Sequence, residues 1–193
     1  MADIKYILAS RSPRRKELLS KIVDSFEIIT RETDESLPDG VHPKEGVELL
    51  AVRKGKAVAD GISADFLIVS SDTLVELGGV PLGKPEDKED AVKMLLNLSG
   101  KTHNVHTGVA IHYKGKVFSG SDTSSVTFKG FGEDEAREYV ATGEPMDKAG
   151  SYAIQGIGAR LVEKYEGDFD TIVGLSLKLT KRLIDEAVAN DEV

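Results

Sequence analysis

The sequence contains no cysteine and no tryptophan, and only 6% of its 193 residues are aromatic. Without cysteine, disulfide bonds, thiol nucleophiles and cysteine-ligated zinc are excluded. The chain also lacks an apolar run of about 18 residues, which a membrane-spanning helix needs, and a basic-then-apolar start typical of exported proteins. We therefore expect a cytoplasmic protein that does not associate with a membrane.

An excess of positive charge is missing as well. Lysine and arginine number 25 against 33 aspartates and glutamates, which gives a formal net charge of −8 at pH 7. Duplex nucleic acid requires a basic face on its partner, so we do not expect it to bind here. A small polyanion is compatible with this charge, because a local group of cations or a divalent metal can offset acidic neighbours.

The four histidines do not form a recognisable metal site. None of His42, His103, His106 and His112 is spaced with another metal ligand on a predicted helix. His103 and His106 are expected on opposite sides of one strand, since side chains alternate along a strand. We interpret all four as structural or solvated.

Strand-like and helix-like segments alternate along the chain, with no repeat and no low-complexity linker. A chain of this length can bury one substantial core, so we predict a single domain over residues 1–193, formed as two lobes. The alternation favours an α/β fold with a mixed, twisted sheet. Strands are predicted over 4–9, 26–30, 66–71, 73–77, 80–82, 103–113, 116–128, 151–154 and 160–165, and helices over 43–58, 88–98, 133–141 and 177–188.

The segment after the first strand has the composition of an anion-binding turn. Ser12 is suited to cap a helix, and Pro13 to its first position, where the missing N–H would be unpaired in any case. Free N–H groups at a helix start attract anions. Ser10, Arg14 and Arg15 add hydroxyl and guanidinium groups that match phosphate oxygens. The alternative is a capped helix with solvated arginines.

An aspartate follows the apolar segment 66–69. Ligands of α/β proteins gather beyond the carboxyl ends of the strands. Asp72 could bind a hard cation or activate a water molecule there. The alternative is a turn residue at a strand end.

Two further polar residues lie in predicted loops. Lys84 stands between Gly83 and Pro85, which suits a fixed positive charge that binds phosphate, although a solvated loop lysine is the alternative. Gln155 carries an amide donor and an acceptor, the groups needed to read a base edge, although it could equally be a satisfied loop amide.

Taken together, these segments resemble the Maf family of nucleotide pyrophosphatases, in the family's order and over nearly the whole chain. The resemblance rests on residues 8–19, 71–75, 83–85, 98–103, 107–109, 144–156, 167–168 and 173–175.

The resemblance implies hydrolysis of a nucleoside triphosphate to its monophosphate and pyrophosphate, with a divalent metal, Mg²⁺ or Mn²⁺. It also implies two α/β lobes around a deep cleft, as in inosine triphosphate pyrophosphatases, and it is compatible with a homodimer. Residues 147–150 and 154–156 look like the branch that acts on dTTP and UTP, including modified pyrimidine nucleotides, in a house-cleaning role.

The resemblance also implies roles for individual residues. Asp72 corresponds to the proton acceptor, and the specificity positions correspond to Arg14, Thr73 and Gln155. The other polar active-site positions correspond to Ser10, Arg15, Glu35, Lys54 and Lys84. Among these we expect Ser10, Arg15, Lys54 and Lys84 to bind phosphate, and Glu35 to bind the metal together with Asp72.

The chain departs from the family pattern at two places. Gly55 follows Lys54 where alanine is usual, and Lys56 lies two residues further on, so either lysine could enter the active site. Ser176 replaces a usual proline, which should change the entry into the last helix more than the chemistry.

Two alternative functions stay open at this point. One is the same reaction on a purine or 7-methyl-GTP substrate. The other is a nucleotide-binding regulator of cell division or septation, which would not need a metal-binding carboxylate beside its phosphate cluster.

Overall fold

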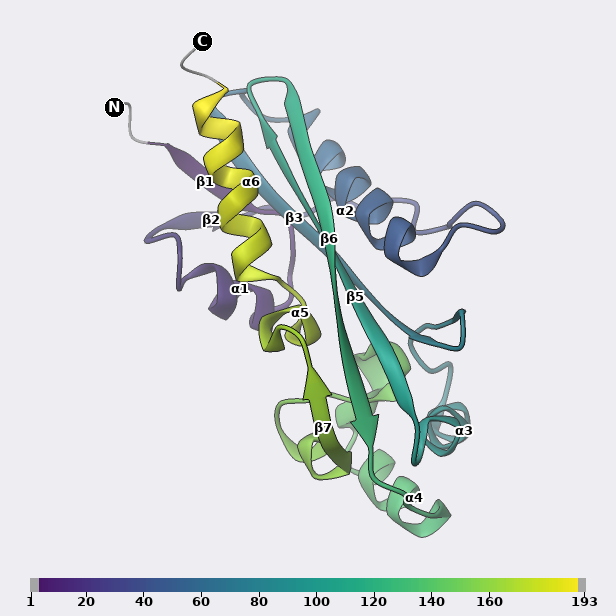
Figure 1. The fold of residues 1–193 in the computed structure, drawn as a ribbon. Coiled ribbons are helices and arrows are strands. Elements are labelled where there is room, and N and C mark those ends of the chain that lie inside the picture. Colours follow the sequence, from purple (N-terminus) through teal and green to yellow (C-terminus); the bar gives the residue numbers. More distant parts are fainter. Residues whose placement is uncertain (1–3, 191–193) are drawn as a thin grey trace. The chain divides into compact units, whose positions relative to one another are not determined.

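The computed structural model describes residues 4–190 as an α/β protein (Figure 1). The strands are β1 (Lys5–Leu8), β2 (Phe26–Ile28), β3 (Phe66–Leu77), β4 (Val80–Leu82), β5 (Thr102–Tyr113), β6 (Lys116–Phe128) and β7 (Val162–Glu166). The α-helices are α1 (Pro13–Leu19), α2 (Pro43–Ala59), α3 (Lys88–Leu98), α4 (Glu133–Ala141), α5 (Phe169–Val173) and α6 (Leu177–Ala189). Three 3₁₀ segments, η1 (Glu144–Asp147), η2 (Ala149–Ser151) and η3 (Ile157–Leu161), connect α4 to β7.

The described strands form one seven-stranded sheet, and this sheet is mixed, as the sequence predicts. Its order is β2-β1-β3-β5-β6-β7, and β4 pairs with β3 off this path. β1 is parallel to both β2 and β3, whereas the β3–β4 and β6–β7 pairs are antiparallel. The parallel β1–β3 pair places Leu8, the last residue of β1, beside Val69, and β3 continues beyond this pairing to Leu77.

The chain divides into two compact units. Unit 1 contains residues 1–72, 107–122 and 174–193, and unit 2 contains residues 73–106 and 123–173. The long strands β3, β5 and β6 each begin in one unit and end in the other.

The core of unit 1 lies between its parallel strands and α2. Ile7 and Ile68, from neighbouring strands, pack with Ala9 and with Val58 of α2. At Gly108 of β5, an added methyl group would collide with the backbone of Val47 in α2. The close approach of α2 to β5 therefore requires glycine at this position.

Unit 2 contains α3 and α4 packed against each other and a small aromatic core. Arg137 of α4 donates to both carboxylate oxygens of Glu89 in α3, at 2.7 and 2.9 Å. His103 packs edge-on against Phe128 and Tyr152, with ring centroids 4.9 and 5.3 Å away. The interior of this unit therefore includes an imidazole, which is 2% exposed.

Most predicted elements are confirmed, and two differ. Residues 66–71 and 73–77 form one continuous strand, because no turn residue interrupts their pairing. The strand predicted over 151–154 is wrong: Ser151 ends η2 and has a φ of +61°, and the residues after it are irregular. Positive φ at both Gly150 and Ser151 is incompatible with an extended strand.

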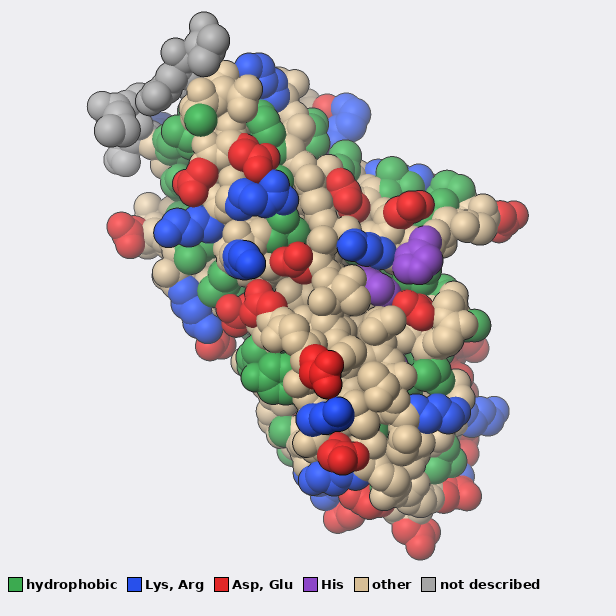
Figure 2. Space-filling model, viewed as in Figure 1, with side chains coloured by type: hydrophobic (Ala, Val, Ile, Leu, Met, Phe, Trp, Pro, Cys, Tyr) green, Lys and Arg blue, Asp and Glu red, His purple; other side chains and the backbone are tan. Residues whose placement is uncertain are grey.

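Charged side chains of both signs are interspersed on the face shown in Figure 2, without one continuous basic surface there. Within residues 4–190, no helix combines the length and the apolar character needed to cross a membrane.

The buried His103 makes the stability of the protein depend on pH. Burial lowers the pKa of His103 to about 4 from the usual 6.5. The unfolded chain therefore binds a proton near pH 6.5 that the folded protein accepts only near pH 4, so stability is lost as the pH falls through this window. We expect wild type to lose about 2 kcal/mol more than His103→Phe between pH 7 and pH 5. Urea unfolding at both pH values measures this, and an equal loss in the two proteins would contradict it.

Candidate functional site

The turn between β1 and α1 is preorganised by its own hydroxyl groups. Ser12 caps α1 by accepting a hydrogen bond from the Arg15 backbone N–H at 3.4 Å, and Pro13 follows it, as predicted. The Ser10 hydroxyl accepts from the Ser12 backbone N–H at 3.2 Å and from Arg15 Nη1 at 3.4 Å. The hydroxyls and guanidinium expected to bind phosphate therefore lie together at the start of a helix.

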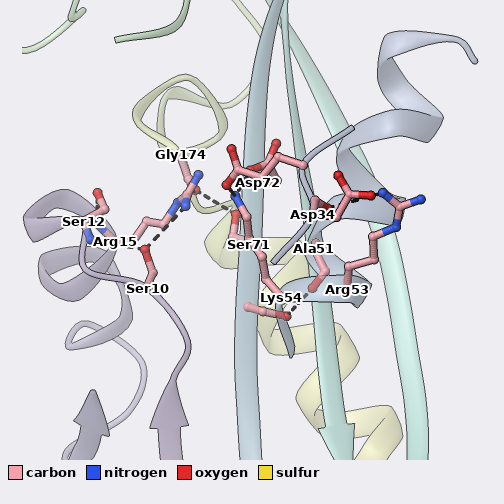
Figure 3. A network of polar contacts seen from close by, with 12 residues as sticks. Ser10, Ser12, Arg15, Asp34, Ala51, Arg53, Lys54, Ser71, Asp72 and Gly174 are labelled. Carbon is pink, nitrogen blue, oxygen red and sulfur yellow. Dashed lines mark hydrogen bonds and ion pairs between the residues drawn. The ribbon is translucent and has the colours of Figure 1, made fainter. Parts of the chain in front are cut away.

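One backbone carbonyl connects this turn to the middle of β3. The carbonyl oxygen of Gly174 accepts from Arg15 Nε at 2.8 Å and from the Ser71 hydroxyl at 2.9 Å (Figure 3). Burial lowers the pKa of the Arg15 guanidinium, against the opposite effect of the Asp72 and Glu35 carboxylates. Arginine stays protonated in proteins, so a fixed positive charge faces this site.

Two carboxylates converge on one ammonium group. Lys54 Nζ, from α2, forms an ion pair with Asp72 Oδ1 in β3 and another with Glu35 Oε1 at 2.8 Å. The side chains of Lys54 and Asp72 are 18% and 11% exposed, whereas Glu35 is 62% exposed. A partly buried acid–base pair therefore lies within β3, three residues past the last residue that pairs with β1 and not beyond a strand end, beside a carboxylate that solvent can reach.

The structure distinguishes the two candidate lysines of α2. Lys54 faces Asp72, whereas Lys56 forms an i,i+4 ion pair with Asp60 at 2.7 Å and is 65% exposed. Residues two apart on a helix lie on different faces, so only one of them can contact β3.

The segment that carries Glu35 is held by a residue that the sequence did not identify. Arg53 Nη1 donates to the carbonyl oxygens of Ser36 at 2.5 Å and Asp34 at 3.4 Å, on either side of Glu35 (Figure 3). Asp34 also accepts from the backbone and the hydroxyl of Ser36, both at 2.8 Å. No motif indicates these contacts, because they depend on where α2 places the arginine.

Asp72 and Glu35 have the oxygen donors that a hard divalent cation prefers. Mg²⁺ is usually bound through one or two carboxylates, together with water and substrate phosphates. The two carboxylates already converge on one cationic group, Lys54 Nζ, which shows that both reach a common position. In the part of the chain that the structure describes, no three metal-ligating side chains gather into a cage. The residues therefore fit a metal shared with a phosphate ligand.

Unit 1 thus brings together six of the residues expected at the site: Ser10, Arg14, Arg15, Glu35, Lys54 and Asp72. The Arg14 guanidinium makes no hydrogen bond or ion pair with any residue in 4–190, so its donors are available to a ligand. Thr73, Lys84 and Gln155 belong to unit 2, where Lys84 and Gln155 are exposed. Their loops are joined by a hydrogen bond from the Gly150 backbone N–H to the Gly83 carbonyl oxygen, at 3.0 Å.

Similarity to known proteins identifies the family of this chain. The family model described as "Maf-like protein" matches residues 5–187. The chain belongs to the Maf family. Two relatives named "dTTP/UTP pyrophosphatase" illustrate the similarity. The protein from Bacillus velezensis is 44% identical over 182 residues, covering 94% of this chain and 96% of the relative. The protein from Pelotomaculum thermopropionicum is 47% identical over 173 residues, covering 89% of this chain and 90% of the relative.

A solved structure shares the fold of this Maf chain. The Staphylococcus aureus Ham1 protein aligns with a TM-score of 0.50 and 15% identity, over 96% of this chain and 94% of that chain. At this identity the likeness concerns the fold alone, and it agrees with the predicted mixed α/β architecture.

Both departures from the Maf pattern have a structural explanation. A methyl group at Gly55 would lie 2.5 Å from His112 Nε2 and 2.6 Å from the Ser70 hydroxyl, so the buried imidazole occupies the space that alanine would need. Ser176 caps α6, where its hydroxyl accepts from the Leu179 backbone N–H at 3.2 Å and donates to Asp122. A proline could not make these side-chain bonds.

We expect Gly55→Ala to destabilise the protein by about 1–3 kcal/mol, because overpacking outweighs the higher helix propensity of alanine. Chemical denaturation measures the change. In a His112→Ala background the same substitution should destabilise less, since only the Ser70 hydroxyl then remains in the way of the methyl group. An equal effect in both backgrounds would show that the imidazole does not explain the glycine.

Proposed function

We propose that this protein hydrolyses dTTP and UTP to the monophosphate and pyrophosphate, including modified pyrimidine nucleotides. The observation that carries the proposal is the pairing of Lys54 with Asp72 and Glu35 beside the Ser10–Arg15 turn, where the parallel pairing of β1 with β3 ends. The names of the relatives support the choice of substrate.

The chain's own residues supply the groups that this reaction needs. A water molecule attacks the α-phosphorus, the bond from that phosphorus to the bridging oxygen breaks, and pyrophosphate leaves. Asp72 takes the proton of the water. Arg14, Arg15 and Lys54 neutralise charge on the phosphates as the leaving group departs.

A divalent metal fits the same reaction. When bound by Asp72 and Glu35, Mg²⁺ or Mn²⁺ supplies positive charge to phosphate oxygens and lowers the pKa of water. Roles of Lys84 in phosphate binding, and of Thr73 and Gln155 in specificity, are supported by the family resemblance. We further propose that residues 1–193 act as one functional domain in the cytoplasm, and that the protein forms a homodimer.

The first test is pyrophosphate release from dTTP, UTP, CTP, GTP, 7-methyl-GTP and ITP, with Mg²⁺ or Mn²⁺, by wild type and Asp72→Asn in parallel. We expect preferential turnover of dTTP and UTP, and a loss of about 10³-fold in kcat in the variant, because asparagine cannot accept the proton. Turnover centred on a purine would keep the chemistry and overturn the substrate. Nucleotide binding without turnover would favour the regulator of cell division instead.

A matched pair of variants tests the lysine assignment. Lys54→Met should lower kcat/KM for dTTP by about 10²-fold, since it removes a positive charge beside the phosphates. Lys56→Met changes a similar side chain two residues away, on a solvent-exposed face, and should leave kcat/KM unchanged. The reverse pattern would place Lys56 in the site.

A further inference from the structure

A glutamate outside the residues assigned so far holds the loop that carries Gln155. Glu144 begins η1, after the two residues that follow α4. Its Oε1 accepts a hydrogen bond from the Ile157 backbone N–H at 3.1 Å, and its Oε2 accepts from the Gly158 backbone N–H at 2.8 Å. One carboxylate therefore fixes the two residues that follow Gln155 and Gly156.

The hydroxyl of Tyr139, in α4, completes this arrangement. It donates to Glu144 Oε2 at 2.6 Å and accepts from the Ala153 backbone N–H at 3.1 Å. The loop from 153 to 158 is thus held on both sides of Gln155. Tyr139 is fully buried, so its ring gives these contacts a rigid base.

We call Glu144 and Tyr139, with their hydrogen bonds to the 153–158 loop, the clamp. The glycines of the loop show how closely the loop backbone approaches the clamp. Gly156 has a φ of +84°, and a methyl group there would collide with Glu144 Oε1. A methyl group at Gly158 would lie 2.5 Å from the Tyr139 hydroxyl. The backbone can approach the carboxylate and the phenol only because neither residue has a side chain.

Burial by itself would raise the pKa of Glu144. The hydrogen bonds from Tyr139, Gly158 and Ile157 act in the opposite direction, and together they lower it below the usual value. The clamp therefore acts as a carboxylate at neutral pH, and charge-assisted hydrogen bonds of this kind are stronger than neutral ones.

The Gln155 side chain itself is exposed and makes no hydrogen bond with any residue in 4–190. Its amide offers one acceptor and one donor group, which match the N3–H donor and the O4 acceptor of uracil or thymine. Cytosine has the reverse pattern, with an acceptor at N3 and a donor at the 4-amino group. Such discrimination depends on a fixed direction of the amide, and the loop backbone determines that direction.

We infer that Glu144 and Tyr139 are positioning residues for base selectivity, which hold the 153–158 loop so that Gln155 discriminates uracil and thymine from cytosine. The inference rests on the proposed function. Neither residue needs to contact the nucleotide. A loosened loop leaves the phosphate-binding residues of unit 1 in place but removes the fixed direction of the amide.

The test compares kcat and KM for UTP and CTP in wild type, Glu144→Gln and Tyr139→Phe. Glutamine has one acceptor oxygen where the loop and Tyr139 present three donors, so at least one donor loses its partner. We expect the UTP-over-CTP ratio of kcat/KM to fall about tenfold in Glu144→Gln, mainly through a higher KM for UTP. Tyr139→Phe should change the ratio in the same direction. Glu135→Gln, on the exposed face of α4, is the matched control and should keep the wild-type ratio.

A second variant disturbs the same loop while the Glu144 carboxylate stays in place. Gly156→Ala displaces the loop from Glu144 and should lower the ratio as Glu144→Gln does, whereas Gly130→Ala, in open space, should not. Hydrogen exchange at the Ile157 and Gly158 amides reports the clamp independently of activity, and it should accelerate in Glu144→Gln.

Three outcomes would overturn the inference alone, and a fourth would refute the proposed function as well. Faster exchange with an unchanged ratio would overturn the inference, because the clamp would then be structural only. Unchanged exchange would overturn it too. Equal loss of kcat on UTP and CTP would point to misfolding or a catalytic role, and would likewise overturn it. Wild-type protein without turnover of any nucleoside triphosphate would instead refute the proposed function, and the inference with it.

Discussion

The parallel pairing of β1 with β3 is the constraint on which the site depends. β1 ends with Leu8 beside Val69, and the chain then forms the Ser10–Arg15 turn, while β3 continues past this point and carries Asp72 three residues further on. Two parallel strands need a crossover connection between them. The connection from β1 to β3 contains α2, and α2 places Lys54 against Asp72. The same pairing that buries the core of unit 1 therefore assembles cations and carboxylates at the place where that pairing ends.

Within each of the two units, a single polar group with several hydrogen-bond partners holds an irregular segment in place. The Gly174 carbonyl oxygen accepts from Arg15 and Ser71, which are far apart in the sequence. In unit 2, the Glu144 carboxylate accepts hydrogen bonds from two backbone amides and from the Tyr139 hydroxyl. A buried polar group without a partner costs about 1–3 kcal/mol, so such shared contacts fix irregular segments that no regular element stabilises.

The sequence predicts well where local rules decide the structure. Ser12 and Pro13 mark the start of α1, the bounds of α3 and α4 are reproduced, and Gly78-Gly79 marks the β3–β4 hairpin. It fails between α4 and β7. The apolar run after Gly150 looks like a strand, but positive φ at Gly150 and Ser151 bends the chain, and the loop is held by Glu144 and Tyr139 rather than by a sheet.

By itself the sequence determined the mixed α/β class, the anion-binding turn and, through its motifs, the Maf family. Those features depend on neighbouring residues, on spacing, or on motifs kept in order. Only the tertiary structure decided that Lys54 and not Lys56 meets Asp72, that Arg53 holds the Glu35 segment, and that Gly55 makes room for His112. Each of these depends on which helix face meets which strand, and that is fixed by packing between segments far apart in the chain.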